Sequence, residues 1–347
     1  MQLLNPTSIV LRLIGIMSVS LVLTGVAFAQ ATDEVVLQAS TATSRITIKC
    51  EVLDYTGKSL VALSSTGKQT TYLAADVISV RTLQTGSHDA GIKEITAGRI
   101  AEAEALFEKA MNQESRQWVR REILALLIRC SLRKSDWTAA GTRFLRLVQS
   151  DPDTRHIDLI PLAWSRRPHD SQTRGNAILW LRDKQPMARL IGASFLVFEP
   201  KYAAEAERAL QELVQQPDER LQTLAQWQQW RRQIGADETS ENELKRWEDR
   251  IAKLPPEMRA GPYFVLAQGF ASRFEFDLAA ATYLRLPLGD ATDHPVTIEA
   301  FLEAAHALQR CGMKAEAARL YREIVTQYGD SPLAQEAQSS LEKIAAK

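Results

Sequence analysis

Two glycine–lysine pairs are the first places in this 347-residue chain where chemistry could be expected, because a glycine-rich loop that ends in lysine can hold a phosphate. They read Gly-Lys-Ser at residues 57–59 and Gly-Lys-Gln at residues 67–69. The leading glycine of such a loop is missing from both, since Val52 and Ala62 occupy its position. Each pair also lies between predicted strands, so no helix N-terminus would face a phosphate. We interpret both as hairpin turns.

The histidines, acidic residues and cysteines predict no catalytic or metal site. The histidines do not have the spacing of metal ligands, and no His-Glu-x-x-His or nucleophile-elbow motif occurs. The acidic side chains are scattered over predicted helices, where no catalytic pair stands out. The three cysteines are too widely spaced for a disulfide framework, and we expect buried free thiols. The sequence therefore predicts a protein that is not an enzyme and holds no metal or cofactor. The residues considered are His88, His156, His169, His294, His306, Cys50, Cys130 and Cys311.

The formal net charge of the chain is zero, because 42 lysines and arginines stand against 42 aspartates and glutamates. This balance predicts neither a nucleic-acid binder nor a protein held on a membrane surface. Arginine clusters do occur, as at residues 166–167 and 231–232, but they are short. We expect them to be solvated.

The first 29 residues have the pattern of an export signal. Arg12 precedes an apolar stretch from Leu13 to Val26, and Ala-Phe-Ala at residues 27–29 is the small-x-small pattern of a cleavage site. Cleavage after Ala29 predicts a periplasmic or secreted protein. An uncut anchor over residues 9–29 is the alternative, since this stretch could nearly span a bilayer. No later segment is apolar enough to cross a membrane.

The elements that follow change from strand to helix. Residues 30–43 are small and polar and predict a flexible linker. Alternating apolar residues then predict strands at 46–52, 60–63, 70–73 and 77–80, separated by turn residues. We expect residues 44–84 to form a small four- to five-stranded SH3-like or Sm-like barrel that leans on the first helices.

Helices are predicted over almost all the rest, and the chain is mainly α. Two stretches repeat one pattern of large and small residues at identical intervals, which suits a two-helix unit of about 34 residues. Weaker copies occur at residues 86–115 and 118–152, and we assign repeats to 85–155. Residues 156–170 predict an irregular connection, and 156–258 hold degenerate helical repeats. Residues 259–347 hold the clearest repeats and a capping helix. The repeated sets are Tyr263, Leu266, Ala267, Phe270, Phe276, Ala279, Tyr283 and Phe301, Ala304, Ala305, Leu308, Lys314, Ala317, Tyr321.

This pattern resembles the tetratricopeptide repeat (TPR), a family of helical scaffolds that bind other proteins. The resemblance implies a solenoid whose first helix in each repeat lines a concave groove. It also implies which residues face a partner. The arginines would bind carboxylates, and the phenylalanine and leucine would add apolar contact. Beside Glu122, Ala125, Leu132, Glu299 and Gln309, the groove candidates are Arg129, Arg133, Phe264, Gln268, Leu302, His306 and Arg310.

The segment from Tyr321 to Ala337 is similar to repeats of exported bacterial TPR proteins that act at the cell envelope. We therefore expect a non-enzymatic scaffold that binds a protein or peptide partner there. The alternative is an accessory helical subunit of an envelope enzyme, such as a peptidoglycan-processing complex. A scaffold tethered by an uncut residue 9–29 anchor is a third possibility.

Overall fold

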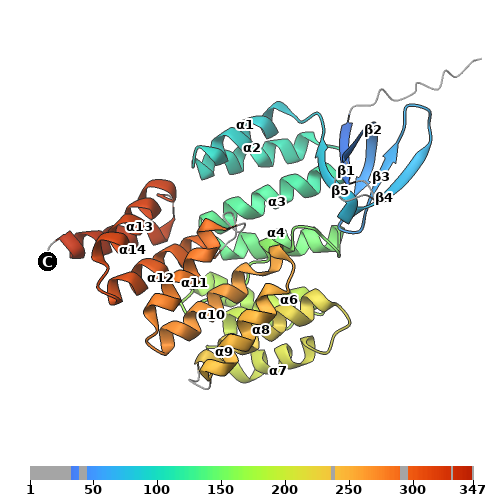
Figure 1. Ribbon diagram of the computed structural model, residues 1–347. Coiled ribbons are helices and arrows are strands. Elements are labelled where there is room, and N and C mark those ends of the chain that lie inside the picture. Colours follow the sequence, from blue (N-terminus) through green and yellow to red (C-terminus); the bar gives the residue numbers. More distant parts are fainter. Residues whose placement is uncertain (1–32, 39–44, 236–238, 290–295, 330, 346–347) are drawn as a thin grey trace, which may run out of the picture.

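The computed structural model describes residues 33–38, 45–235, 239–289, 296–329 and 331–345. The predicted signal peptide at 1–29 and His294 lie outside these residues. Within them, a small antiparallel sheet is followed by helices almost throughout, so the predicted fold class is confirmed (Figure 1). None of the described helices is both long enough and apolar enough to cross a bilayer.

The sheet has five strands in the order β4-β3-β2-β1-β5. Four of them fall where the alternation predicted them, and the hairpin turn at residues 56–59 is closed by a bond from the Thr56 amide to the Ser59 carbonyl. A short 3₁₀ turn, η1 (Ala74–Asp76), precedes the last strand. The strands are β1 (Asp33–Gln38), β2 (Arg45–Tyr55), β3 (Ser59–Leu63), β4 (Gln69–Leu73) and β5 (Val77–Arg81).

Two predictions about this region were wrong. First, β1 lies inside the segment 30–43 that we expected to be a linker; its alternation of Val35 and Leu37 is too brief to stand out without the partner strands. Second, the sheet does not close into a barrel, because β4 and β5 form its two edges. Helices cover its apolar face instead: Val52 and Leu60 share a core with Phe107 of the second helix. A sheet whose face is covered in this way has no need to curl shut.

Fourteen α-helices are described after the sheet, and they pack largely as successive pairs (Figure 1). The capping helix predicted at the C-terminus is present, and its Leu341 and Ile344 pack against the C-terminal core. The helices are α1 (Gly86–Thr96), α2 (Ile100–Gln113), α3 (Gln117–Arg133), α4 (Trp137–Ser150), α5 (Ser171–Leu181), α6 (Pro186–Leu196), α7 (Ala203–Leu213), α8 (Glu219–Gly235), α9 (Glu241–Ala252), α10 (Ala260–Ser272), α11 (Phe276–Leu288), α12 (Thr297–Arg310), α13 (Lys314–Gln327) and α14 (Pro332–Ala345).

Four helical hairpins share one turn. In each, the second residue after the first helix has a positive φ, and the next helix begins two residues later: Gly98 (79°), Ser135 (58°), Phe274 (64°) and Gly312 (80°). The amide after each of these residues bonds to a carbonyl in the last turn of the preceding helix. This is the left-handed end that closes many helices. The pairs α1–α2, α3–α4, α10–α11 and α12–α13 therefore share one hairpin turn.

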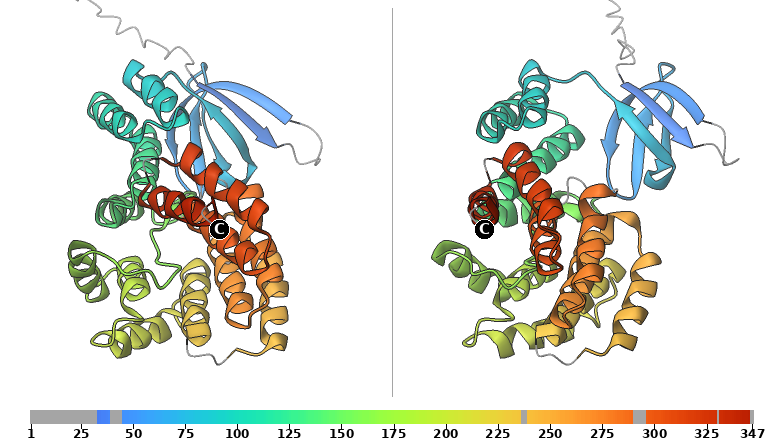
Figure 2. Two further views of the ribbon diagram at one scale, coloured as in Figure 1. Left: turned by 90° about the vertical axis from the view of Figure 1, so that its left-hand side faces the viewer. Right: turned by 60° about the vertical axis from the view of Figure 1, so that its left-hand side comes forward.

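The array curls so that its last helices return to its first (Figure 2). The Arg133 guanidinium on α3 lies 5.6 Å from the ring centre of Tyr328, which follows α13. The same arginine donates to the Ile95 carbonyl at 3.3 Å. Through the middle runs one core that reaches from Leu124 to Ala307.

Candidate functional site

The connection between α4 and α5 lies within this core. We name residues 155–167 the strap. It is irregular, as predicted, apart from the 3₁₀ turn η2 (Ile157–Leu159), yet it is apolar and buried. Its backbone is satisfied by side chains: the Ala163 amide donates to Ser194 Oγ at 3.1 Å, and Arg231 donates to the Ser165 carbonyl. The buried strap residues are Ile157, Leu159, Ile160, Pro161, Leu162, Ala163 and Trp164.

Several of the expected groove positions contact the strap. Glu122 accepts an ion pair from Arg155 at 2.5 Å and a hydrogen bond from His156 at 3.2 Å. Arg129 pairs with Asp158 at 3.8 Å. Farther along, Arg167 pairs with Glu299 and Glu303 of α12, each at 2.8 Å. The positions expected to face a partner therefore face the chain itself.

Phe264 and Leu302 were expected to offer apolar contact to a partner, and the structure contradicts this prediction. Both are fully buried. Phe264 packs edge-on against Tyr283, with ring centres 5.1 Å apart, and Leu302 belongs to the C-terminal core. Helix packing occupies both side chains, so neither offers contact area to a partner.

The polar candidates are dispersed. His306 faces Glu303 at 3.4 Å and Glu336 at 3.9 Å. Arg310 is exposed, with its guanidinium 5.5 Å from the ring centre of Phe276, and Gln268 is half-buried on α10. Arg133 lies where the first and last repeats meet. The seven candidates thus do not form one surface, and only Arg129 lines the cleft described next.

A cleft of about 450 Å³ separates β5 from α3. This volume is within the usual range of ligand sites. Three positions expected to face a partner, Glu122, Ala125 and Arg129, line it from α3. The other lining residues come from the sheet, the connection between β5 and α1, α1, α3 and the strap: Tyr55, Val77, Ile78, Ser79, Val80, Thr82, Gln84, His88, Trp118, Val119, Leu126, Arg155 and His156.

The ionisable groups of the cleft are set by burial and by each other. Burial raises the pKa of Glu122, but the His156 hydrogen bond and the Arg155 charge outweigh it, so the pKa lies below its usual value. Burial lowers the pKa of His88, which keeps this imidazole neutral at pH 7. Only 3% of His88 is exposed, and its Nδ1 has no hydrogen-bond partner among the described residues. A buried nitrogen without a partner is costly in free energy.

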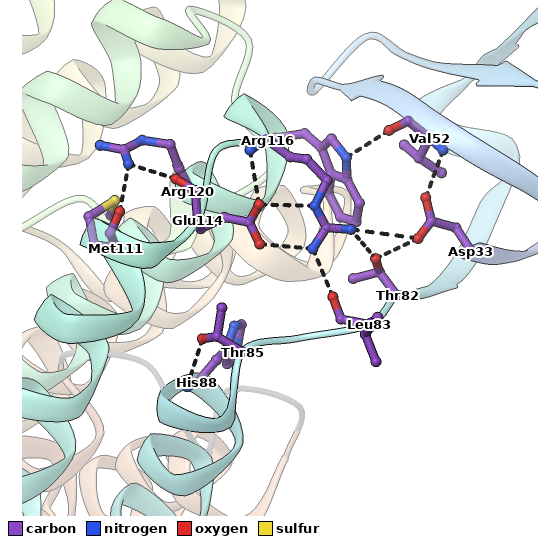
Figure 3. A network of polar contacts seen from close by, with 11 residues as sticks. Asp33, Val52, Thr82, Leu83, Thr85, His88, Met111, Glu114, Arg116 and Arg120 are labelled. Carbon is purple, nitrogen blue, oxygen red and sulfur yellow. Dashed lines mark hydrogen bonds and ion pairs between the residues drawn. The ribbon is translucent and has the colours of Figure 1, made fainter. Parts of the chain in front are cut away.

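One arginine holds the sheet against the helices beside this cleft (Figure 3). Arg116 donates to both carboxylate oxygens of Glu114, at 3.0 and 2.8 Å, and to Thr82 Oγ1 at 2.6 Å. The Trp118 indole donates to the Val52 carbonyl at 2.9 Å. The hydrogen bonds from Arg116 lower the pKa of Glu114, which is therefore charged at pH 7. Both walls of the cleft are fixed by these buried or half-buried bonds.

Sequence reasoning missed most of this cleft. It treated His88 and His156 only as possible metal ligands, and it gave Tyr55 and Arg155 no role. The strand at 77–80 was predicted, but the order of strands in a sheet is not readable from alternation, so its place at an edge was hidden. The one available signal was the strap itself. A connection that carries Ile157, Leu159, Ile160, Leu162 and Trp164 is too apolar to lie in solvent.

The described residues hold no group of three or more histidine, cysteine or acidic side chains that could bind a metal. Cys50 and Cys130 are buried free thiols as expected, whereas Cys311 is exposed. The chain matches no protein-family model and no curated protein.

Proposed function

We propose that the protein is an exported, non-enzymatic scaffold of the bacterial cell envelope that binds a partner protein or an extended peptide. Binding takes place in the cleft between β5 and α3 rather than along the inner face of a TPR-like array. The observation that carries this proposal is the cleft, where exposed strand residues, two arginines and a buried imidazole face one space.

The free energy gained by burying the strap favours partner binding in the cleft over partner binding in the inner groove of the array. Five large apolar side chains of the strap are buried, and each contributes about 2 kcal/mol. Displacing the strap would therefore cost roughly 10 kcal/mol, which exceeds the free energy of about 8 kcal/mol of a micromolar complex. A partner that enters the cleft leaves the strap in place. It meets residues that are already positioned, and such preorganisation reduces the entropy lost on binding.

Photo-crosslinking in cells tests the proposal. A photoreactive amino acid replaces Ser79, an exposed cleft residue, and its matched control replaces Leu179, which is 68% exposed on α5. We expect discrete protein adducts from position 79 and not from position 179. Equal adducts at the two positions, or none at either, would contradict binding in the cleft.

Export has its own test. N-terminal sequencing of the protein recovered from the periplasm or medium should begin at Gln30. A membrane-bound protein that begins at Met1 would support the uncut anchor and contradict cleavage after Ala29.

A further inference from the structure

We propose that the core between the strap and α8 binds one small monovalent anion, such as chloride, through Arg231 and Gln228. This inference does not depend on the cleft or on its partner. It concerns what holds the strap in its buried position.

Arg231 is a buried cation whose hydrogen-bond partners are uncharged. Its guanidinium donates to the Ser194 carbonyl at 2.7 Å, to Gln228 Oε1 at 2.9 Å and to the Ser165 carbonyl. None of these acceptors carries a full negative charge, and only 3% of Arg231 is exposed. A buried charge without a counter-charge is costly in free energy. A bound anion would remove much of that cost.

The charges that act on Arg231 do not neutralise it. Glu299 attracts the guanidinium, but Arg167 already pairs with this carboxylate at 2.8 Å. Arg166 adds a second positive charge: the two guanidiniums of Arg166 and Arg231 lie 4.7 and 4.8 Å from the centre of the Phe198 ring. Burial lowers the pKa of Arg231 to about 9, so the side chain is still a cation at pH 7. An anion is therefore attracted to it.

Hydrogen-bond donors without acceptors occur in the same part of the core. Among the described residues, the buried nitrogens Arg231 Nε, Gln228 Nε2 and Trp164 Nε1 have no hydrogen-bond partner. The Gln228 oxygen accepts from Arg231, which fixes the amide so that its NH₂ group is the open end. Trp164 directly precedes Ser165, whose carbonyl accepts from Arg231. All three open groups can only donate. A water molecule there would also have to donate, whereas an anion only accepts.

Burial limits the size of the anion. Gln228 is fully buried and Trp164 is 4% exposed, so a peptide carboxylate could reach them only if the core unfolded. A small ion can enter through local opening of the fold. One guanidinium balances one negative charge, which favours a monovalent ion. Because Arg231 also holds the strap backbone at Ser165, such an ion would stabilise the strap where it lies.

Crystals of the mature protein grown with bromide in place of chloride test the site directly. Diffraction at the bromine absorption edge should show an anomalous peak in contact with Arg231 Nε and Gln228 Nε2. Density at this position without anomalous signal would mean that water alone fills the site, and it would overturn the proposal. The lack of any density there would overturn it as well.

Hydrogen exchange measures the effect of the ion in solution. Chloride replaces gluconate, a much larger anion, while the ionic strength is kept constant. Opening of the strap would release the ion, so chloride should slow the exchange of amides 157–164. At a concentration about ten times the dissociation constant, protection should rise about elevenfold. Protection that does not change with chloride would contradict the proposal.

A glutamate at position 228 would supply the counter-charge within the chain. Gln228→Glu keeps the oxygen that accepts from Arg231 but removes the open NH₂ group, so the effect of chloride should disappear. Gln233→Glu adds the same charge at an exposed position of α8 and should keep the full effect. An equal effect in both variants would be a general effect of salt and would overturn the proposal. If Gln228→Glu does not fold, the bromide peak in the unmodified protein decides.

Discussion

Two buried ionisable side chains, His169 and Arg231, have pKa values that are lowered by their burial in the core. His169 packs edge-on against Phe195 and Trp137, with ring centres 4.6 and 6.1 Å away. Burial, followed by the Arg231 charge, lowers its pKa to about 4. Arg231 was expected to be solvated but is only 3% exposed, and burial lowers its pKa to about 9. It donates to the backbone of Ser194 at 2.7 Å. Both side chains serve packing around the strap.

The pKa of His169 gives a pH prediction. The folded pKa lies below the unfolded value of about 6.5, so the unfolded chain binds the proton more readily. Its contribution is fully present above pH 6.5 and is lost as the pH falls toward 4, with an upper limit of about 3 kcal/mol. His169→Phe should therefore flatten the fall in unfolding free energy over this range, measured by urea denaturation. Parallel pH curves for the two proteins would contradict this assignment.

At the scale of elements, glycine marks where the strap and the helices touch. Gly261 lies on α10, and a Cβ there would lie 2.1 Å from the Trp164 ring. The Trp164 side chain is buried in the core, so a methyl group at position 261 would have to displace packed atoms. Gly175 on α5 has no atom within 4 Å of the same position.

Gly261→Ala should therefore destabilise the protein by about 1–3 kcal/mol through overpacking. Gly175→Ala is the matched control and should stabilise α5 by up to about 1 kcal/mol, because alanine favours a helix interior. Denaturation midpoints measure both. If Gly261→Ala proves as stable as its control, the contact between strap and α10 is not as described.

The helices and four strands were predictable because their signals are local. Alternation located β2 to β5, and the pattern of large and small residues located the hairpins. Gly98 follows α1 with a φ of 79°, a left-handed conformation that glycine adopts readily. The predictions that were wrong concern features that depend on contacts between residues far apart in the sequence. β1 could not be recognised without its neighbouring strands, and the open edge could not be located without the strand order. The resemblance to the TPR family assigned groove positions, but it could not reveal that the strap contacts several of them, such as Glu122 and Arg129.

At the scale of the whole molecule, one arginine joins three distant elements. Arg167 at the end of the strap pairs with Glu299 and Glu303 of α12 and with Glu336 of α14, at 2.8, 2.8 and 2.6 Å. Burial raises the pKa of Glu299 even with this cation beside it. The strap therefore also connects the start of the array to its end.

Removing this cation should destabilise the protein in a pH-dependent way. Arg167→Met leaves Glu299 buried without its partner and should cost about 3 kcal/mol at pH 8. The folded pKa of Glu299 is raised, so the proton is held more tightly in the folded state. The loss should therefore shrink as the pH falls toward 5. Arg174→Met on the exposed face of α5 is the control and should change stability by less than about 0.5 kcal/mol. A loss that does not depend on pH would contradict this role.

Hydrogen exchange on the protein alone, and again with the partner captured at Ser79, tests the central claim most directly. That claim is that the strap permanently fills the inner groove, so a partner binds between β5 and α3. We predict that amides 157–164 exchange slowly in both states and that binding adds protection only in β5 and along α3. Amides of the strap that exchange rapidly once the partner is bound would show that the strap is displaced, and would contradict the account.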